Sequence, residues 1–97
     1  MLKYKFSHIF PISDMLIIVN NYFQKKFYDG YMLLKKIGKN IRFLRKKAGL
    51  SQIDLAVAVG IDRSYLSEIE NGRRNMTIML LQNLSTVLSV NLEDIIK

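Results

Sequence analysis

The residues of this chain that could do chemistry are its cations, because the usual catalytic and metal-binding groups are scarce. The 97 residues include no cysteine and a single histidine, His8. A disulfide framework, thiolate chemistry and a histidine-based zinc centre are therefore excluded. The sequence also has no Gly-rich phosphate loop, catalytic triad or spaced carboxylate pair. We therefore expect no enzyme activity, no metal and no cofactor.

Positive charge is concentrated in one part of the sequence. Residues 1–31 carry four basic and two acidic groups, residues 32–60 carry seven and one, and residues 61–97 carry four and five, which gives the net charge of +7. A local surplus of this kind is typical of a surface that faces phosphates. The alternative is an ordinary solvated helix face, which we prefer for Lys35 and Lys36.

Two short helices are predicted in the stretch Gln52–Asn71, where the charge surplus ends. Each has a pair of apolar residues at helical spacing. These pairs are Leu55 with Val59 and Leu66 with Ile69. The small residue Ala56 lets the two helices cross closely, and Gly60 supplies the positive φ of a sharp turn.

Capping residues mark where these helices begin. Ser51 and Asp54 form a capping pattern for the first helix, and the Asp62 carboxylate is well placed to cap the second. Together these features fit a helix-turn-helix whose second helix enters a DNA major groove, or else an ordinary helical hairpin.

Three further helices are predicted around this pair, at residues 33–47, 78–88 and 92–96, with Gly49 ending the first and Thr77 capping the second. The first two carry apolar stripes: Leu34, Ile37, Ile41, Leu44 and Ala48, then Ile78, Leu81, Leu84 and Leu88. The last helix is apolar at Leu92, Ile95 and Ile96, which either cover the core or meet a partner.

Residues 1–31 are more apolar and aromatic than the rest of the chain, and they are interpreted as an N-terminal extension to a domain of residues 32–97. We expect one helix there, from about Asp14 to Tyr28, capped by Ser13 or Asp14 and closed by Gly30. Neither a signal peptide nor a membrane span is indicated, because the longest apolar run is Met15–Val19. The apolar face of the predicted N-terminal helix either packs on the domain or forms a dimer arm. Alternatively, the protein starts at Met32 and this helix is not made.

The segment Ile37–Val90 resembles the Xre family of Cro/repressor-type helix-turn-helix proteins. The matching residues are IGKNIRFLRKKAGLSQIDLAVAVG, IDRSYLSEIENGRRN and TIMLLQNLSTVLSV. The resemblance implies an all-α, five-helix lambda-repressor-like domain, here with an extra N-terminal helical segment. It also implies a non-enzymatic protein that binds operators as a dimer.

The run RSYLSEIENGRRNMTI is also similar to the controller regulators of restriction–modification systems, although it occurs in phage and chromosomal regulators too. Controllers carry a longer last helix for dimerisation than Leu92–Lys97 offers, and residues 14–28 could replace it.

Residue roles follow from the resemblance. The base-reading residues would be Arg63, Ser64, Ser67 and Glu68, and Arg45 would form a salt bridge with Glu70. The resemblance implies phosphate contacts from Arg45, Gln52, Asn71, Arg73 and Arg74, and we add Lys46, Ser51 and Tyr65 to this phosphate-binding set.

Side-chain chemistry supports some of these roles and leaves others open. Arg63 offers two parallel donors that match guanine O6 and N7. Glu68 either accepts from a cytosine amino group or is an outward charge paired with Arg63 or another cation. Tyr65 either braces the DNA backbone or packs against the protein.

The sequence therefore predicts a cytoplasmic, sequence-specific DNA-binding regulator of transcription. It would occupy a palindromic operator as a homodimer, without a small-molecule ligand and without a membrane. The alternative is an antitoxin-like protein-interaction module that binds DNA secondarily. The apolar N-terminal stretch is the feature that suggests this alternative.

Overall fold

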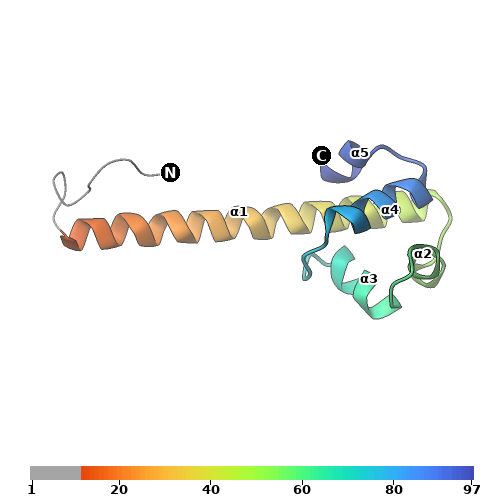
Figure 1. The fold of residues 1–97 in the computed structure, drawn as a ribbon, viewed down its shortest axis with the longest axis horizontal. Helices are drawn as coiled ribbons and strands as arrows, with labels where there is room; N and C mark the ends of the chain where they lie inside the picture. Colours follow the sequence, from red (N-terminus) through yellow and green to blue (C-terminus); the bar gives the residue numbers. More distant parts are fainter. Residues whose placement is uncertain (1–11) are drawn as a thin grey trace. The chain divides into compact units, whose positions relative to one another are not determined.

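A computed structural model describes residues 12–97 and is all-helical over that range (Figure 1). The helices are α1 (Ile12–Lys47), α2 (Gln52–Val59), α3 (Arg63–Glu70), α4 (Ile78–Leu88) and α5 (Leu92–Ile96). No strand occurs among these residues, so the predicted all-α, five-helix fold class is confirmed. The chain divides into two compact units, Met1–Gly30 and Tyr31–Lys97, and the second unit contains all of α2 to α5.

The predicted helix end at Gly30 is wrong. The helices expected at residues 14–28 and 33–47 form one helix, which begins at Ile12, so neither Ser13 nor Asp14 holds the N-cap position. A glycine inside a helix costs only about 1 kcal/mol relative to alanine, and the segment contains no proline to stop propagation. The apolar face expected between Met15 and Phe27 falls on side chains outside the part that the structure describes. The separation of residues 1–31 from 32–97 as domains stays a prediction.

The core of the second unit is formed by apolar residues from all five helices. Helix α2 packs on α3 and α4, and α4 packs on α5. The buried apolar residues are Ile37, Ile41, Leu55, Ala56, Leu66, Ile69, Leu81, Leu84, Leu88 and Ile95. Because Ile95 is fully buried, the last helix covers the core.

Two predicted core positions are wrong. Ile78 is 73% exposed because it opens α4 and the buried stripe begins one turn later, at Leu81. Ala48 is exposed because α1 ends at Lys47, so Ala48 no longer shares the helical stripe.

The turn between α2 and α3 has the predicted backbone. Gly60 lies in the left-handed region with φ of 77°, and the Ile61 amide donates to the Ala56 carbonyl at 3.0 Å. Asp62 occupies the N-cap position of α3, but its carboxylate makes no capping hydrogen bond, contrary to the prediction. Asp62 is exposed, so its carboxylate can remain hydrated without loss.

The start of α2 has the predicted capping box. The Ser51 hydroxyl accepts from the Asp54 amide and the Asp54 carboxylate accepts from the Ser51 amide, both at 3.0 Å. The hydrogen bond from the Ser51 backbone amide, together with a smaller contribution from the Ser51 side chain, holds the pKa of Asp54 below its ordinary value of 3.8. Thr77 caps α4 in the same manner by accepting from the Leu80 amide at 3.1 Å.

Helix α1 approaches the end of α3 very closely at Gly38. A Cβ atom at this position would collide with the Ile69 carbonyl oxygen and would lie 2.8 Å from the carbonyl oxygen of Glu70. Gly72 faces the same helix, since a Cβ there would lie 2.7 Å from the Lys35 Cα. The close approach of α3 to α1 therefore depends on glycine, which has no side chain, at positions 38 and 72.

Substitution of Gly38 tests this close approach. We expect Gly38→Ala to lower the free energy of unfolding by about 1–3 kcal/mol, because backbone atoms must shift to admit the methyl group. Gly30→Ala is the matched control: a Cβ there meets nothing within 4 Å, so the variant should keep or gain up to about 1 kcal/mol from helix propensity. Urea denaturation followed by circular dichroism measures both, and an equal loss in the two variants would contradict the packing argument.

The capping box predicts a pH dependence of stability. Because the folded-state pKa of Asp54 is depressed, its contribution is present above the unfolded value of 3.8 and is lost as the pH falls through the lower folded value. Asp54→Ala should therefore be less stable than the wild type at neutral pH, and the difference should shrink in acid. Asp62→Ala is the control, since its carboxylate caps nothing. Urea midpoints across the acid range measure the difference, and a gap independent of pH would refute it.

Candidate nucleic-acid interface

A buried ion pair joins α1 to α3. The Arg45 guanidinium donates to both carboxylate oxygens of Glu70, through Nε at 2.7 Å and Nη2 at 3.0 Å. Arg45 is 7% exposed and Glu70 is 5% exposed. This is the pair that the family resemblance implied. Two parallel charge-assisted bonds fix the orientation of both side chains as well as their distance.

The same two residues also hold the start of α2. Arg45 Nη1 donates to the Leu50 carbonyl at 2.9 Å, and Gln52 Nε2 donates to Glu70 Oε1 at 3.1 Å. The link from Gln52 to Glu70 was not predicted, because nothing in the local sequence pairs residues 18 positions apart. Arg45 is buried and each of its three guanidinium nitrogens donates one hydrogen bond within the protein, so the phosphate-binding set proposed below does not include it. Gln52 is half-buried beside the N-terminus of α2.

The predicted base-reading residues share one side of α3. Arg63 and Ser64 are exposed, while Ser67 and Glu68 are half-buried. The opposite side carries the buried residues Leu66, Ile69 and Glu70. At about 100° per residue, Ser64 and Glu68 lie most nearly opposite this buried side. Helix α3 therefore presents a polar face to solvent, while its opposite face packs in the core.

The remaining candidates lie at the end of α1, at the start of α2, within α3 and just after it. Lys46, Ser51, Asn71, Arg73 and Arg74 are exposed. The side-chain amide of Asn71 donates through Nδ2 to the Ser67 carbonyl at 2.8 Å, so this residue also caps the end of α3. Tyr65 is half-buried, and its hydroxyl donates to the Asn75 carbonyl at 3.5 Å. Packing is therefore part of the role of Tyr65.

Glu68 forms an ion pair, but its partner is Arg74 and not Arg63. The Arg74 Nε donates to Glu68 Oε2 at 3.1 Å, and both side chains remain about half exposed, at 54% and 44%. The Arg74 guanidinium carbon also lies 5.1 Å from the centre of the Tyr65 ring, within cation–π distance.

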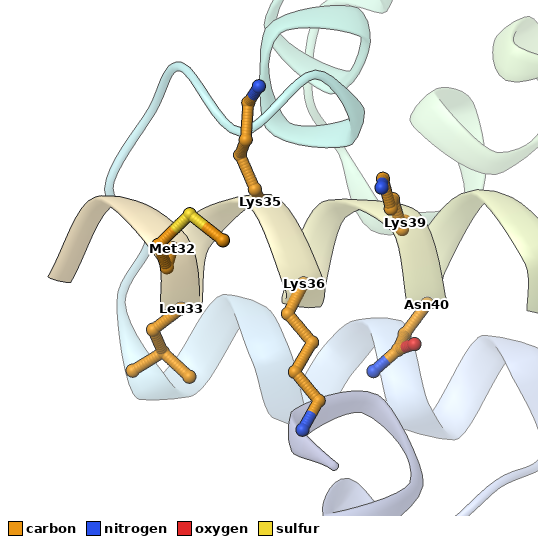
Figure 2. Close-up of a pocket in the computed structure, with 6 residues that line it drawn as sticks. All are labelled: Met32, Leu33, Lys35, Lys36, Lys39 and Asn40. Carbon is orange, nitrogen blue, oxygen red and sulfur yellow. The ribbon is translucent and has the colours of Figure 1, made fainter. Parts of the chain in front are cut away.

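A shallow hollow on α1 is a weaker candidate site. It is lined by Met32, Leu33, Lys35, Lys36, Lys39 and Asn40. Figure 2 shows Lys35 and Lys39 on one side of the helix, with Lys36 and Asn40 pointing the opposite way. Because the ammonium groups do not converge, they do not build a pocket for one anion. Their arrangement agrees with the solvated helix face preferred for Lys35 and Lys36.

Comparison with known proteins identifies the arrangement of α2, turn and α3. Residues 41–95 match the HTH_3 family, described as helix-turn-helix, which is more than half of the chain. The chain belongs to this family. The family recognised in the sequence, an Xre-type helix-turn-helix, is thereby confirmed.

Individual proteins similar to this chain include control proteins and HTH-type transcriptional regulators. The control protein C.MunI of a Mycoplasma species is 38% identical over 61 residues, 62% of this chain and 82% of that protein. The restriction–modification controller C.AhdI of Aeromonas hydrophila has a similar structure, with a TM-score of 0.62 and 39% identity over 64% of this chain and 94% of the other.

A third relative has been solved with a bound nucleic acid. The biofilm regulator SinR, in complex with DNA, matches with a TM-score of 0.59 and 39% identity over 63% of this chain and 98% of the other.

None of the helices among residues 12–97 is long and apolar enough to cross a membrane.

Removal of one partner of the buried ion pair should be severe. We expect Arg45→Met to lower the free energy of unfolding by about 3–5 kcal/mol, because the Glu70 carboxylate is left buried without its cation. The double variant Arg45→Met, Glu70→Met should recover much of this loss, since no charge is then stranded. Guanidinium denaturation of the wild type, both single variants and the double variant gives the coupling free energy. Additive losses would show that the two side chains contribute independently.

Proposed function

We propose that this protein is a sequence-specific DNA-binding regulator of transcription that acts by occupying an operator. The observation that carries the proposal is the outward face of α3, where four polar side chains are exposed or half-exposed while the opposite side is locked to the core. A rigid polar helix face of this kind fits a major groove. Family membership and the DNA complex of SinR support it.

The base contacts would come from Arg63, Ser64, Ser67 and Glu68. Arg63 opens α3 and is exposed, so its guanidinium can reach the O6 and N7 atoms of guanine with two parallel donors. Ser64 and Ser67 can donate or accept, and so they add contacts with little selectivity of their own.

The phosphate contacts would flank this face. Gln52 and Ser51 lie at the N-terminus of α2, whose free amides favour an anion. The other members of the set are Lys46, Tyr65, Asn71, Arg73 and Arg74. Such contacts would supply most of the affinity and make it sensitive to salt.

Operator binding as a homodimer is part of the proposal. Two copies of α3 would then read half-sites about one helical turn, roughly 34 Å, apart. A palindromic operator follows from the twofold symmetry of such a dimer. The controller relatives C.MunI and C.AhdI make a controller role in restriction–modification one form that this regulation could take.

Selection from random duplexes at one fixed salt concentration tests the proposed function. We expect the wild type to enrich a palindrome and Arg63→Ala to lose about 1–3 kcal/mol of discrimination at one position of each half-site. Lys36→Ala is the matched control, because it removes the same charge from the solvated face of α1. Its selected sequence should equal that of the wild type.

The opposite result would be equal binding of all duplexes, with affinity that depends only on salt. In that case the basic charge attracts DNA without reading it, and the protein-interaction alternative would be tested next by co-purification.

A further inference from the structure

Glu68 poses an electrostatic problem for the proposed interface. It lies one turn after Ser64, near the middle of the outward face of α3, so a docked α3 cannot keep it away from the DNA. A carboxylate among phosphates is repelled unless it gains a hydrogen-bond donor or a cation. The residue therefore has to be neutralised or used.

The structure supplies a cation and holds it in place. Arg74, in the segment after α3, donates through Nε to Glu68 Oε2 at 3.1 Å. Its guanidinium lies over the Tyr65 ring at 5.1 Å, and the Tyr65 hydroxyl donates to the Asn75 carbonyl at 3.5 Å. Two residues of α3 and two of the following segment thus form one cluster, which we call the Glu68–Arg74–Tyr65 cluster.

The geometry of this cluster leaves an acceptor available. Arg74 engages Oε2, and no residue among those described donates to Oε1 of Glu68. The Glu68 side chain is 44% exposed, so this oxygen is open to an incoming group. Restraint by Arg74 lowers the entropy lost when Glu68 makes a further contact.

We propose that Arg74 positions Glu68 as the acceptor for the N4 amino group of cytosine, so that the Glu68–Arg74–Tyr65 cluster selects a C·G base pair at one position of each half-site. The inference rests on the proposed function. Glu68 is the specificity-determining residue, and Arg74 acts through it as a positioning residue supported by Tyr65.

Base chemistry explains the choice of cytosine. In the major groove guanine presents O6 and N7, and thymine presents O4, all of which are acceptors that repel a carboxylate. Adenine offers an N6 amino group with the N7 acceptor on the same base, whereas the major-groove edge of cytosine itself offers only the amino group. The expected order at this position is cytosine, then adenine, then guanine and thymine.

Selection from random duplexes with Glu68 variants tests the inference. Glu68→Gln should lose the preference for cytosine, by a factor of about 5 to 150, and should gain adenine at the same position, because a glutamine amide pairs with adenine N6 and N7. A purely structural role of Glu68 would not produce an exchange of one base for another. Circular dichroism of each variant checks that it is folded.

Arg74 variants separate positioning from simple charge. Arg74→Lys keeps the charge but lacks the Nε donor, so it should weaken the cytosine preference while the salt dependence of binding stays near that of the wild type. Arg73→Ala is the matched control: Arg73 is the exposed neighbouring cation, and it forms no ion pair with the side chains that the structure describes. It should lower affinity on all duplexes alike and leave the cytosine preference unchanged.

The outcomes distinguish the inference from the function on which it rests. If the wild type selects a sequence but Glu68→Gln selects the same one, the inference is overturned and the proposed function stands. If Glu68→Gln loses cytosine while Arg74→Lys does not, Arg74 does not position Glu68. If the wild type selects no sequence at all, the proposed function itself fails.

Discussion

The buried Arg45–Glu70 ion pair is the constraint on which the rest of the structure depends. Two ions have been removed from water, which is costly unless their hydrogen bonds are nearly complete. Here the guanidinium is shared between Glu70 and the Leu50 carbonyl, and Glu70 also accepts from Gln52. The Arg45–Glu70 pair therefore connects α1, the turn after it, α2 and α3. Any movement of α3 would break charged hydrogen bonds in a dry environment, and so the outward face of α3 has a fixed orientation.

Close packing reinforces this constraint at the same place. Gly38 allows α1 to approach the carbonyl groups of Ile69 and Glu70, directly beside the ion pair. The glycine permits the close approach of α1 to α3, and the ion pair fixes the orientation of α3 relative to α1. The proposed function needs both, because a helix that reads base edges has to be held to within a fraction of an ångström. Stability and recognition are therefore coupled through α3.

Much of the fold could be predicted because its signals are local. The capping box of Ser51 and Asp54, the Gly60 turn and the spacing of Leu66 and Ile69 each involve residues within one or two turns. Some local signals were misread, and contacts between separate segments were not predicted. Gly30 resembles a helix end but lies inside α1, Ile78 fits the apolar stripe but lies outside the core, and the Gln52–Glu70 and Arg74–Glu68 contacts have no local pattern. The roles of the site residues on DNA stay predictions for the same reason, because they depend on a partner.

Backbone amide NMR shifts of the isotopically labelled full chain, recorded as its selected duplex is added, test the central claim most directly. The claim is that the outward face of α3, together with the start of α2, meets the DNA. We expect the largest shifts at Arg63, Ser64, Ser67 and Glu68, smaller ones at Ser51, Gln52 and Arg73, and little change in α5. Shifts confined to α5 or to residues 12–30, with α3 unaffected, would contradict the account.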